Sequence, residues 1–213
     1  MPTQSLIVPK DSHFRKTRVL PFIGQDYGRV MPWGLPIFVL GESHYSGIPL
    51  YSTFTRDVVS EMLNGVNYPF FTKAAGVFYG DWPDLEMRRK FWQTAAFYNF
   101  VQESVGDTAR IRPTERMWRE AAPALEETLM LCMPGFVLVL GKELWDNLPI
   151  PLRDGPEVKL GNGERKQSRL YFNDNGYAFT FGINHPCSPG WTYKKWTPWV
   201  KAALVTAINF QNG

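Results

Sequence analysis

The sequence predicts an α/β protein in which helices cover both faces of a short, mostly parallel central sheet, a three-layer α/β/α arrangement. Two apolar runs, residues 36–40 and 136–141, have the length and composition of strands buried on both faces. A third run, residues 177–186, alternates and then breaks, which also indicates a strand. Helical patterns lie between these runs, and such alternation is typical of α/β layer folds.

The helical patterns are amphipathic. They cover residues 53–64, 84–96 and 114–131. Thr114 is expected to cap the third helix, and Pro123 is expected to kink or divide it. The end of a further strand is expected at residues 96–101, and Thr197 with Pro198 is expected to open the final helix.

Two segments are predicted to lack regular structure. Residues 1–34 are rich in proline, glycine and charge and are expected to form an irregular N-terminal extension. Residues 153–170 are rich in glycine and charge and are expected to form a solvated connection. The chain shows no internal repeat and no boundary between two domains, so residues 1–213 are predicted to be a single domain.

Composition limits the class of protein. The fractions of apolar (44%) and charged (20%) residues are those of a globular chain, and the net charge of +3 permits a nucleic-acid partner without requiring one. Two cysteines are too few for a disulfide framework or a cluster of cysteine ligands. The N-terminus has no signal-peptide pattern, and no apolar stretch has the length of a membrane span. We therefore expect a cytoplasmic monomer with no membrane association and no cofactor.

Polar clusters follow three of the predicted strands. Glu42, Ser43, His44 and Tyr45 come directly after the first strand and Gly41. Asn99 lies near the end of a second, and residues 184–190 follow a third. Because the carboxyl ends of parallel strands meet at one edge of a sheet, we expect these side chains to share a crevice.

The order of these motifs resembles the uracil-DNA glycosylase superfamily. The resemblance covers most of residues 36–205: a strand followed by GE, an asparagine at a second strand, RPT…PALEE before VLVLG, and HP…SP before the final helix. It implies a uracil-DNA glycosylase-like fold and hydrolysis of the bond between a damaged or deaminated base and its sugar, with the base flipped out of DNA. The cysteines of the iron–sulfur branch of that superfamily are absent, so no iron–sulfur cluster is expected.

The resemblance also implies roles for individual residues. Glu42 falls at the position of the water-activating acid in the iron–sulfur branch, and His185 at the histidine of the HPS motif. Asn99 matches the asparagine that reads the base, and Tyr45 matches the tyrosine of the GQDPYH motif that excludes bulkier bases. Ser43 and His44, between these two motif residues, are expected to contact the substrate.

Residues after His185 are implied to hold the DNA. Ser188 lies one position later than the serine of the HPS motif, whose place Cys187 takes. Trp191 or Tyr193 is placed like a wedge inserted into the minor groove. Lys194 and Lys195 are expected to contact phosphate.

Other interpretations of the same residues stay open. Ser43 stands where the GQDPYH motif of the main, uracil-excising branch has aspartate, which favours a catalytically silent nucleic-acid or nucleotide-binding protein of the same fold. Glu42, His44 and His185 are alternatively ligands of a hydrolytic metal. Glu42 can also serve only to satisfy free N–H groups at the start of a helix, and Trp191 can be a core residue.

Overall fold

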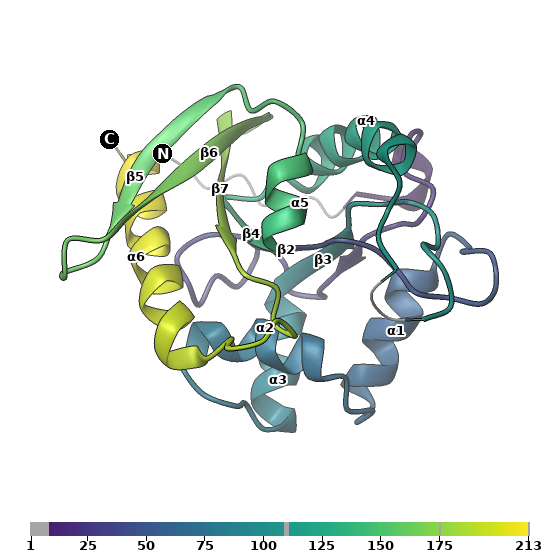
Figure 1. Cartoon of the computed structure of the whole chain (residues 1–213), viewed down its shortest axis with the longest axis horizontal. Helices are drawn as coiled ribbons and strands as arrows, with labels where there is room; N and C mark the ends of the chain where they lie inside the picture. The colour runs from purple at the N-terminus through teal and green to yellow at the C-terminus, as the bar shows by residue number, and fades with distance from the viewer. Residues whose placement is uncertain (1–8, 109–110, 175, 213) are drawn as a thin grey trace.

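A computed structural model of the chain describes residues 9–108, 111–174 and 176–212. Within these residues the protein is a mixed α/β structure with one seven-stranded sheet (Figure 1). The strands are β1 (Phe22–Ile23), β2 (Ile37–Gly41), β3 (Ala95–Asn99), β4 (Phe136–Leu140), β5 (Arg153–Lys159), β6 (Arg165–Asn173) and β7 (Gly176–Ile183). The α-helices are α1 (Phe54–Leu63), α2 (Pro69–Tyr79), α3 (Leu85–Thr94), α4 (Glu115–Cys132), α5 (Lys142–Asn147) and α6 (Tyr193–Asn212).

The sheet is parallel at its centre and antiparallel at both edges. Its order is β1-β3-β2-β4-β7-β6-β5. The four strands β3, β2, β4 and β7 pair in parallel, whereas β1, β6 and β5 join by antiparallel pairing. The expectation of a mostly parallel sheet is therefore correct only for the central strands. Antiparallel hairpins need only a short turn, so they extend the sheet without another crossover helix.

Helices cover both faces of the sheet. Alternate residues of β2 point to opposite sides: Ile37 and Val39 pack with α1, α2, α3 and α6, while Phe38 and Leu40 pack with α4 and α5. All five residues of β2 are buried, as in a strand covered from both sides. The same alternation in β4 continues both apolar layers.

The structure confirms three of the predicted helices, which are α1, α3 and α4. Thr114 caps α4 as expected, because its Oγ1 accepts a hydrogen bond from the Met117 N–H at 3.3 Å. The expected division at Pro123 is wrong, since α4 runs as one helix from Glu115 to Cys132 with Pro123 inside it; the expected kink stays a prediction. Buried residues on both sides of Pro123 hold α4 against the sheet. The sequence patterns do not predict α2, because aromatic residues dominate its first turn and obscure a polar face.

The predicted start of the final helix is also wrong. Helix α6 begins at Tyr193 rather than after Thr197, and Pro198 lies inside it. Thr192 provides the cap: its Oγ1 accepts from the Lys195 N–H at 3.3 Å, and its carbonyl accepts from the Trp196 N–H at 3.1 Å. Thr192 has no proline after it, so the threonine–proline pair further along the chain is the stronger local signal for a helix start.

The segment predicted as a solvated connection, residues 153–170, is instead a β-hairpin. Strands β5 and β6 pair in antiparallel fashion at the edge of the sheet, with a register shift between Asp154 and Glu157. The exposed charged residues that suggest a loop face solvent on one side. Val158, Ser168 and Leu170 lie buried on the other. Charged side chains are common on edge strands, where they discourage pairing with another chain.

The N-terminal segment is mostly irregular over its described part, residues 9–34; residues 1–8 lie outside the described residues. It contains a short 3₁₀ helix, Asp11–His13, and β1. The Glu127 carboxylate accepts backbone N–H bonds from Arg15, Lys16 and Thr17 at 2.7–3.0 Å, which fixes the segment against α4. This interaction stabilises an extension that has little secondary structure of its own.

Both cysteines are free thiols: Cys132 is buried in α4 and Cys187 is exposed after β7. Burial raises the pKa of the Cys132 thiol to about 12, as expected of a core cysteine. In the described part of the chain, no helix combines the length and the apolar character needed to cross a lipid bilayer.

Candidate functional site

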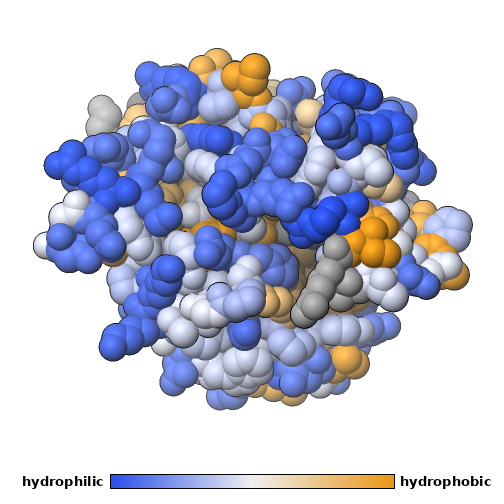
Figure 2. Space-filling view, viewed as in Figure 1, coloured by the Kyte–Doolittle hydropathy of each residue, from blue (hydrophilic) through white to orange (hydrophobic). Residues whose placement is uncertain are grey.

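The central parallel strands bring three of the predicted side chains to one edge of the sheet. Glu42 directly follows β2, Asn99 is the last residue of β3, and His185 lies two residues after the end of β7. β2 is the neighbour of β3, and only β4 separates β2 from β7, so the three strand ends lie along one edge of four adjacent parallel strands. Figure 2 shows the surface hollowed near its middle, in the region that holds β2, β3 and α5 in Figure 1.

Gly41 makes room for the Asn99 amide. The two residues are partners in the parallel register of β2 and β3. A Cβ atom on Gly41 would lie 2.2 Å from Asn99 Oδ1 and 3.0 Å from Phe97 Cζ, so any larger residue would displace the amide. The position of the Asn99 amide therefore requires a glycine at residue 41, which the sequence alone does not reveal.

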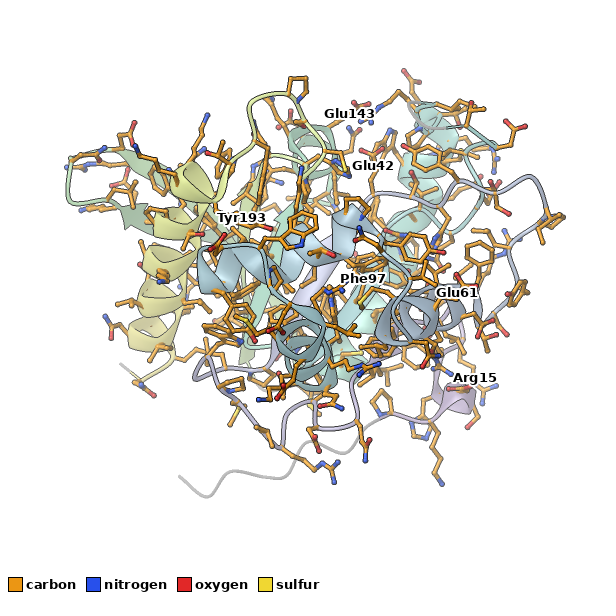
Figure 3. All side chains as sticks on the ribbon, turned by 90° about the horizontal axis from the view of Figure 1, so that it is seen from below. Arg15, Glu42, Glu61, Phe97, Glu143 and Tyr193 are labelled. Atoms are coloured by element: carbon orange, nitrogen blue, oxygen red, sulfur yellow. The ribbon has the colours of Figure 1, made fainter. Side chains whose placement is uncertain are left out.

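Glu42 is a buried carboxylate held by an arginine. Its exposed fraction is 9%, and its Oε2 accepts a hydrogen bond from Arg112 Nη2 at 2.8 Å. Arg112 also bonds Glu143 of α5, so one guanidinium joins two carboxylates that lie close together (Figure 3). Burial raises the pKa of Glu42; Arg112 opposes that rise and the Glu143 charge adds to it. The carboxylate is thus desolvated but fixed in orientation.

His185 is held as a neutral hydrogen-bond donor. Its Nδ1 accepts the Cys187 backbone N–H at 3.1 Å, so the neutral ring carries its proton on Nε2. The ring stacks on Phe70 of α2, with 5.3 Å between ring centroids. Burial, with the charges of Arg112 and Lys73, lowers the pKa of His185 below its usual value. A neutral imidazole can donate to a developing anion without losing its proton.

His44 lies behind Asn99 rather than on an open turn. It is 7% exposed, and its Nε2 lies 2.8 Å from Thr55 Oγ1. Asn99 Nδ2 lies 3.1 Å from both ring nitrogens of His44. Burial lowers the pKa of His44 to about 4, so the ring is neutral at physiological pH. In this position His44 holds the Asn99 amide. The predicted contact of His44 with substrate stays a prediction.

The other two residues after β2 differ in exposure. Ser43 Oγ is buried, and among the described residues it has no hydrogen-bond partner. Tyr45 is 41% exposed, and its phenol lies close enough to Arg112 to contribute to the raised pKa of the guanidinium. An exposed ring beside Arg112 is compatible with a residue that limits the size of a ligand, the role that the resemblance implies.

The residues expected to wedge into DNA are packed against the protein. Trp191 is only 9% exposed and belongs to the apolar core, with Lys73 Nζ 5.6 Å from its ring centroid. The Tyr193 hydroxyl is buried, 2.6 Å from the point where a Cβ on Gly76 would stand. In this structure neither ring is free to insert between bases, because core packing already uses both.

The remaining predicted DNA-binding residues lie nearer to solvent. The Ser188 N–H donates to the His185 carbonyl at 2.8 Å, closing a tight turn just after the imidazole. Lys194 and Lys195 lie in the first turn of α6, and both side chains are exposed. Their position is compatible with phosphate binding, which stays a prediction.

Four residues that line or tune this edge are missed by reasoning from the sequence. They are Phe70, Lys73, Arg112 and Glu143. Arg112 is the first residue of the RPT motif, in which the sequence assigns a role only to Thr114, the predicted helix cap. Phe70 and Lys73 lie on α2, the helix that the sequence patterns do not predict.

The metal-ligand interpretation of Glu42, His44 and His185 gains no support from the geometry. In the part of the chain that the structure describes, no group of three His, Cys, Asp or Glu side chains is arranged to hold a metal ion. His44 points its ring to Thr55 and Asn99 instead.

No protein-family model matches the chain, and no curated protein matches it at a significant level. The functional inference therefore comes from the residues of the site.

Proposed function

We propose that this protein has a uracil-DNA glycosylase-like fold and hydrolyses the N-glycosidic bond of a damaged or deaminated base flipped out of DNA. One observation carries the proposal: Glu42, Asn99 and His185 come from the ends of three parallel strands to one edge of the sheet. The parallel central strands, with helices on both faces, fit the fold that the sequence resemblance implies.

In this proposal Glu42 acts at the sugar. Its carboxylate orients a water molecule for attack on C1′ and stabilises the positive charge of an oxocarbenium-like sugar. The C1′–N bond breaks, its electron pair leaves with the base, and the water proton passes to Glu42. Arg112 holds the carboxylate in place at 2.8 Å and keeps its pKa from rising further.

His185 and Asn99 act at the base. The Nε2–H of neutral His185 donates a hydrogen bond to the carbonyl oxygen of the departing base anion. The Asn99 amide reads the hydrogen-bonding edge of the base and is positioned by His44 and by the space over Gly41. Phe70, stacked on His185, supplies an aromatic surface beside the imidazole.

Formation of abasic sites tests the proposal. The substrates are oligonucleotides that carry uracil, hypoxanthine, xanthine or a mismatch. We expect cleavage of at least one, and we expect Glu42→Gln to lower its rate by about 100-fold or more, since a positioned acid–base group contributes about 10²–10⁴-fold. Glu120→Gln is the matched control, because Glu120 is an exposed carboxylate paired with Arg116 on α4. No cleavage of any substrate, or equal cleavage by both variants, would contradict the proposal.

A second candidate is a nucleic-acid-binding protein of the same fold without turnover. Two interactions favour it, because they already engage groups that the glycosylase needs. Glu42 Oε2 accepts a hydrogen bond from Arg112, and Asn99 Nδ2 contacts the His44 ring. Ser43, in place of the aspartate of the main branch, adds no carboxylate. This candidate predicts salt-dependent DNA binding with no abasic product.

A further inference from the structure

A second cleft lies next to the candidate site, between the β5–β6 hairpin and the first turns of α6. Its volume is about 680 Å³. Its lining includes Asn184, which directly precedes His185, so the cleft adjoins the candidate site at this residue. The cleft depends on the β5–β6 hairpin, which the sequence patterns do not predict.

Positive charge dominates the lining. The cationic side chains are those of Arg165, Lys166, Lys194 and Lys195, whereas Glu164 is the single carboxylate among the lining residues. Glu164 accepts a hydrogen bond from Asn162 within the hairpin turn, and Arg165 pairs with Glu157. Among the described residues, none of the three lysines forms an ion pair with a carboxylate. The three ammonium groups outnumber the single Glu164 carboxylate in this cleft, so the lining keeps an excess of positive charge that attracts an anion.

Two of the lysines are held over aromatic rings. Lys166 Nζ lies 5.3 Å from the ring centroid of Trp196 and 5.5 Å from that of Trp199, and Lys195 Nζ lies 5.2 Å from Trp196. Cation–π interactions of this length restrict the lysine heads without neutralising them. The rings themselves are 2% and 5% exposed, so they offer little surface for stacking a base. The cleft presents charge rather than an aromatic platform.

We propose that this cleft binds the phosphodiester backbone of the nucleic acid that flanks the candidate site. Phosphate contacts supply affinity and register without reading sequence, and lysine is suited to them as a compact point charge. Arg165 and Lys166 thereby extend the predicted phosphate-binding surface of Lys194 and Lys195 onto a second structural element. This backbone site rests on the proposed nucleic-acid partner and does not depend on cleavage of a base.

The test measures the affinity for a fluorescent 20-base-pair duplex of unmodified DNA at several salt concentrations. A duplex without a damaged base, combined with Glu42→Gln protein, removes any contribution of excision. We expect Lys166→Gln combined with Lys195→Gln to weaken binding for every duplex sequence. The slope of log K against log salt is expected to become shallower by about 2, because each lysine that neutralises a phosphate contributes about 1 to the slope.

Matched controls use the same elements outside the cleft. Lys159 of β5 and Lys201 of α6 are exposed and do not line the cleft, so Lys159→Gln combined with Lys201→Gln makes an equal change in net charge. We expect this pair to keep the wild-type slope. Lys194→Gln, at a further lining position, is expected to lower the slope by about 1 without disturbing the lysine–tryptophan interactions.

The outcomes separate this backbone site from the proposed function. A shallower slope in the cleft variants, with no excision by the wild type, supports the backbone site and contradicts only the glycosylase. Normal excision with an unchanged slope contradicts the backbone site alone. An equally shallow slope in the cleft and control pairs also overturns it, because net charge would then explain the effect. Binding of polyglutamate but not DNA would overturn it as well, since the cleft would then take an acidic peptide.

Discussion

Protonation of His44 should limit the stability of the fold in mild acid. Burial lowers the pKa of the ring from 6.5 to about 4, and a pKa difference of this size corresponds to about 3 kcal/mol. Because the folded pKa is depressed, this stability is present above pH 6.5 and is lost as the pH falls toward 4. The linkage relation gives a loss of about 2–3 kcal/mol between pH 7.5 and pH 4.5.

Replacing the imidazole by an amide tests this magnitude. Glutamine in His44→Gln can still hydrogen-bond Thr55 Oγ1 but cannot take up a proton in this range. We expect urea unfolding at the two pH values to show a stability loss that is smaller by about 2–3 kcal/mol in His44→Gln than in the wild type. The comparison uses the difference between pH values, so a constant effect of the substitution cancels.

His13→Gln is the control, because His13 is an exposed histidine in the N-terminal 3₁₀ helix. We expect it to retain the wild-type loss between pH 7.5 and pH 4.5. An undiminished loss in His44→Gln would refute the reasoning, because it would mean that the ring is not buried and neutral in the folded protein.

Three further substitutions probe the edge of the sheet. Gly41→Ala is expected to lower the free energy of unfolding by about 1–3 kcal/mol and to abolish base selectivity, since the new Cβ displaces the Asn99 amide. Arg112→Ala removes the charge that lowers the pKa of Glu42, so the acid limb of the activity profile is expected to move to higher pH. Trp191→Ala is expected to lower the melting temperature markedly, with about 3 kcal/mol or more of stability lost, because the indole is a core residue.

Two of these substitutions have a matched control elsewhere in the chain. Arg116→Ala removes an arginine that pairs with Glu103 and Glu120, and it should leave the pH profile unchanged. Trp82→Ala removes a tryptophan that is 48% exposed, and its effect on stability should stay within about 0.5 kcal/mol. If Trp191→Ala weakened DNA binding while leaving the melting temperature unchanged, the wedge interpretation would replace the core interpretation.

Periodicity and apolar runs are sufficient to predict the central strands and three of the helices. Residues such as Val39 and Leu138 belong to strands buried on both faces, and a short run of β-branched and aliphatic residues is a direct sign of such burial. The same logic fails at the edge of the sheet. There β5 carries charge on its solvent face, and only the alternation around Val158 distinguishes it from a loop.

The site is predictable to the extent that it follows from strand ends. Glu42, Asn99 and His185 can be placed together because parallel strands end at a common edge. Their partners cannot, since Arg112 comes from a connection before α4 and Phe70 from a helix without a clear sequence pattern. Proximity between residues this far apart depends on how the layers pack, which local sequence patterns do not encode.

The central claim is that Glu42 and His185 act on one glycosidic bond. Single-turnover excision by Glu42→Gln, His185→Gln and the double variant tests it most directly. We predict that each single substitution slows excision by about 100-fold or more, and that the double variant is only slightly slower than the worse single, because groups that act as one unit are not additive. The claim would be contradicted if the rate loss of the double variant equalled the product of the two single losses. It would also be contradicted if the wild-type protein released no base.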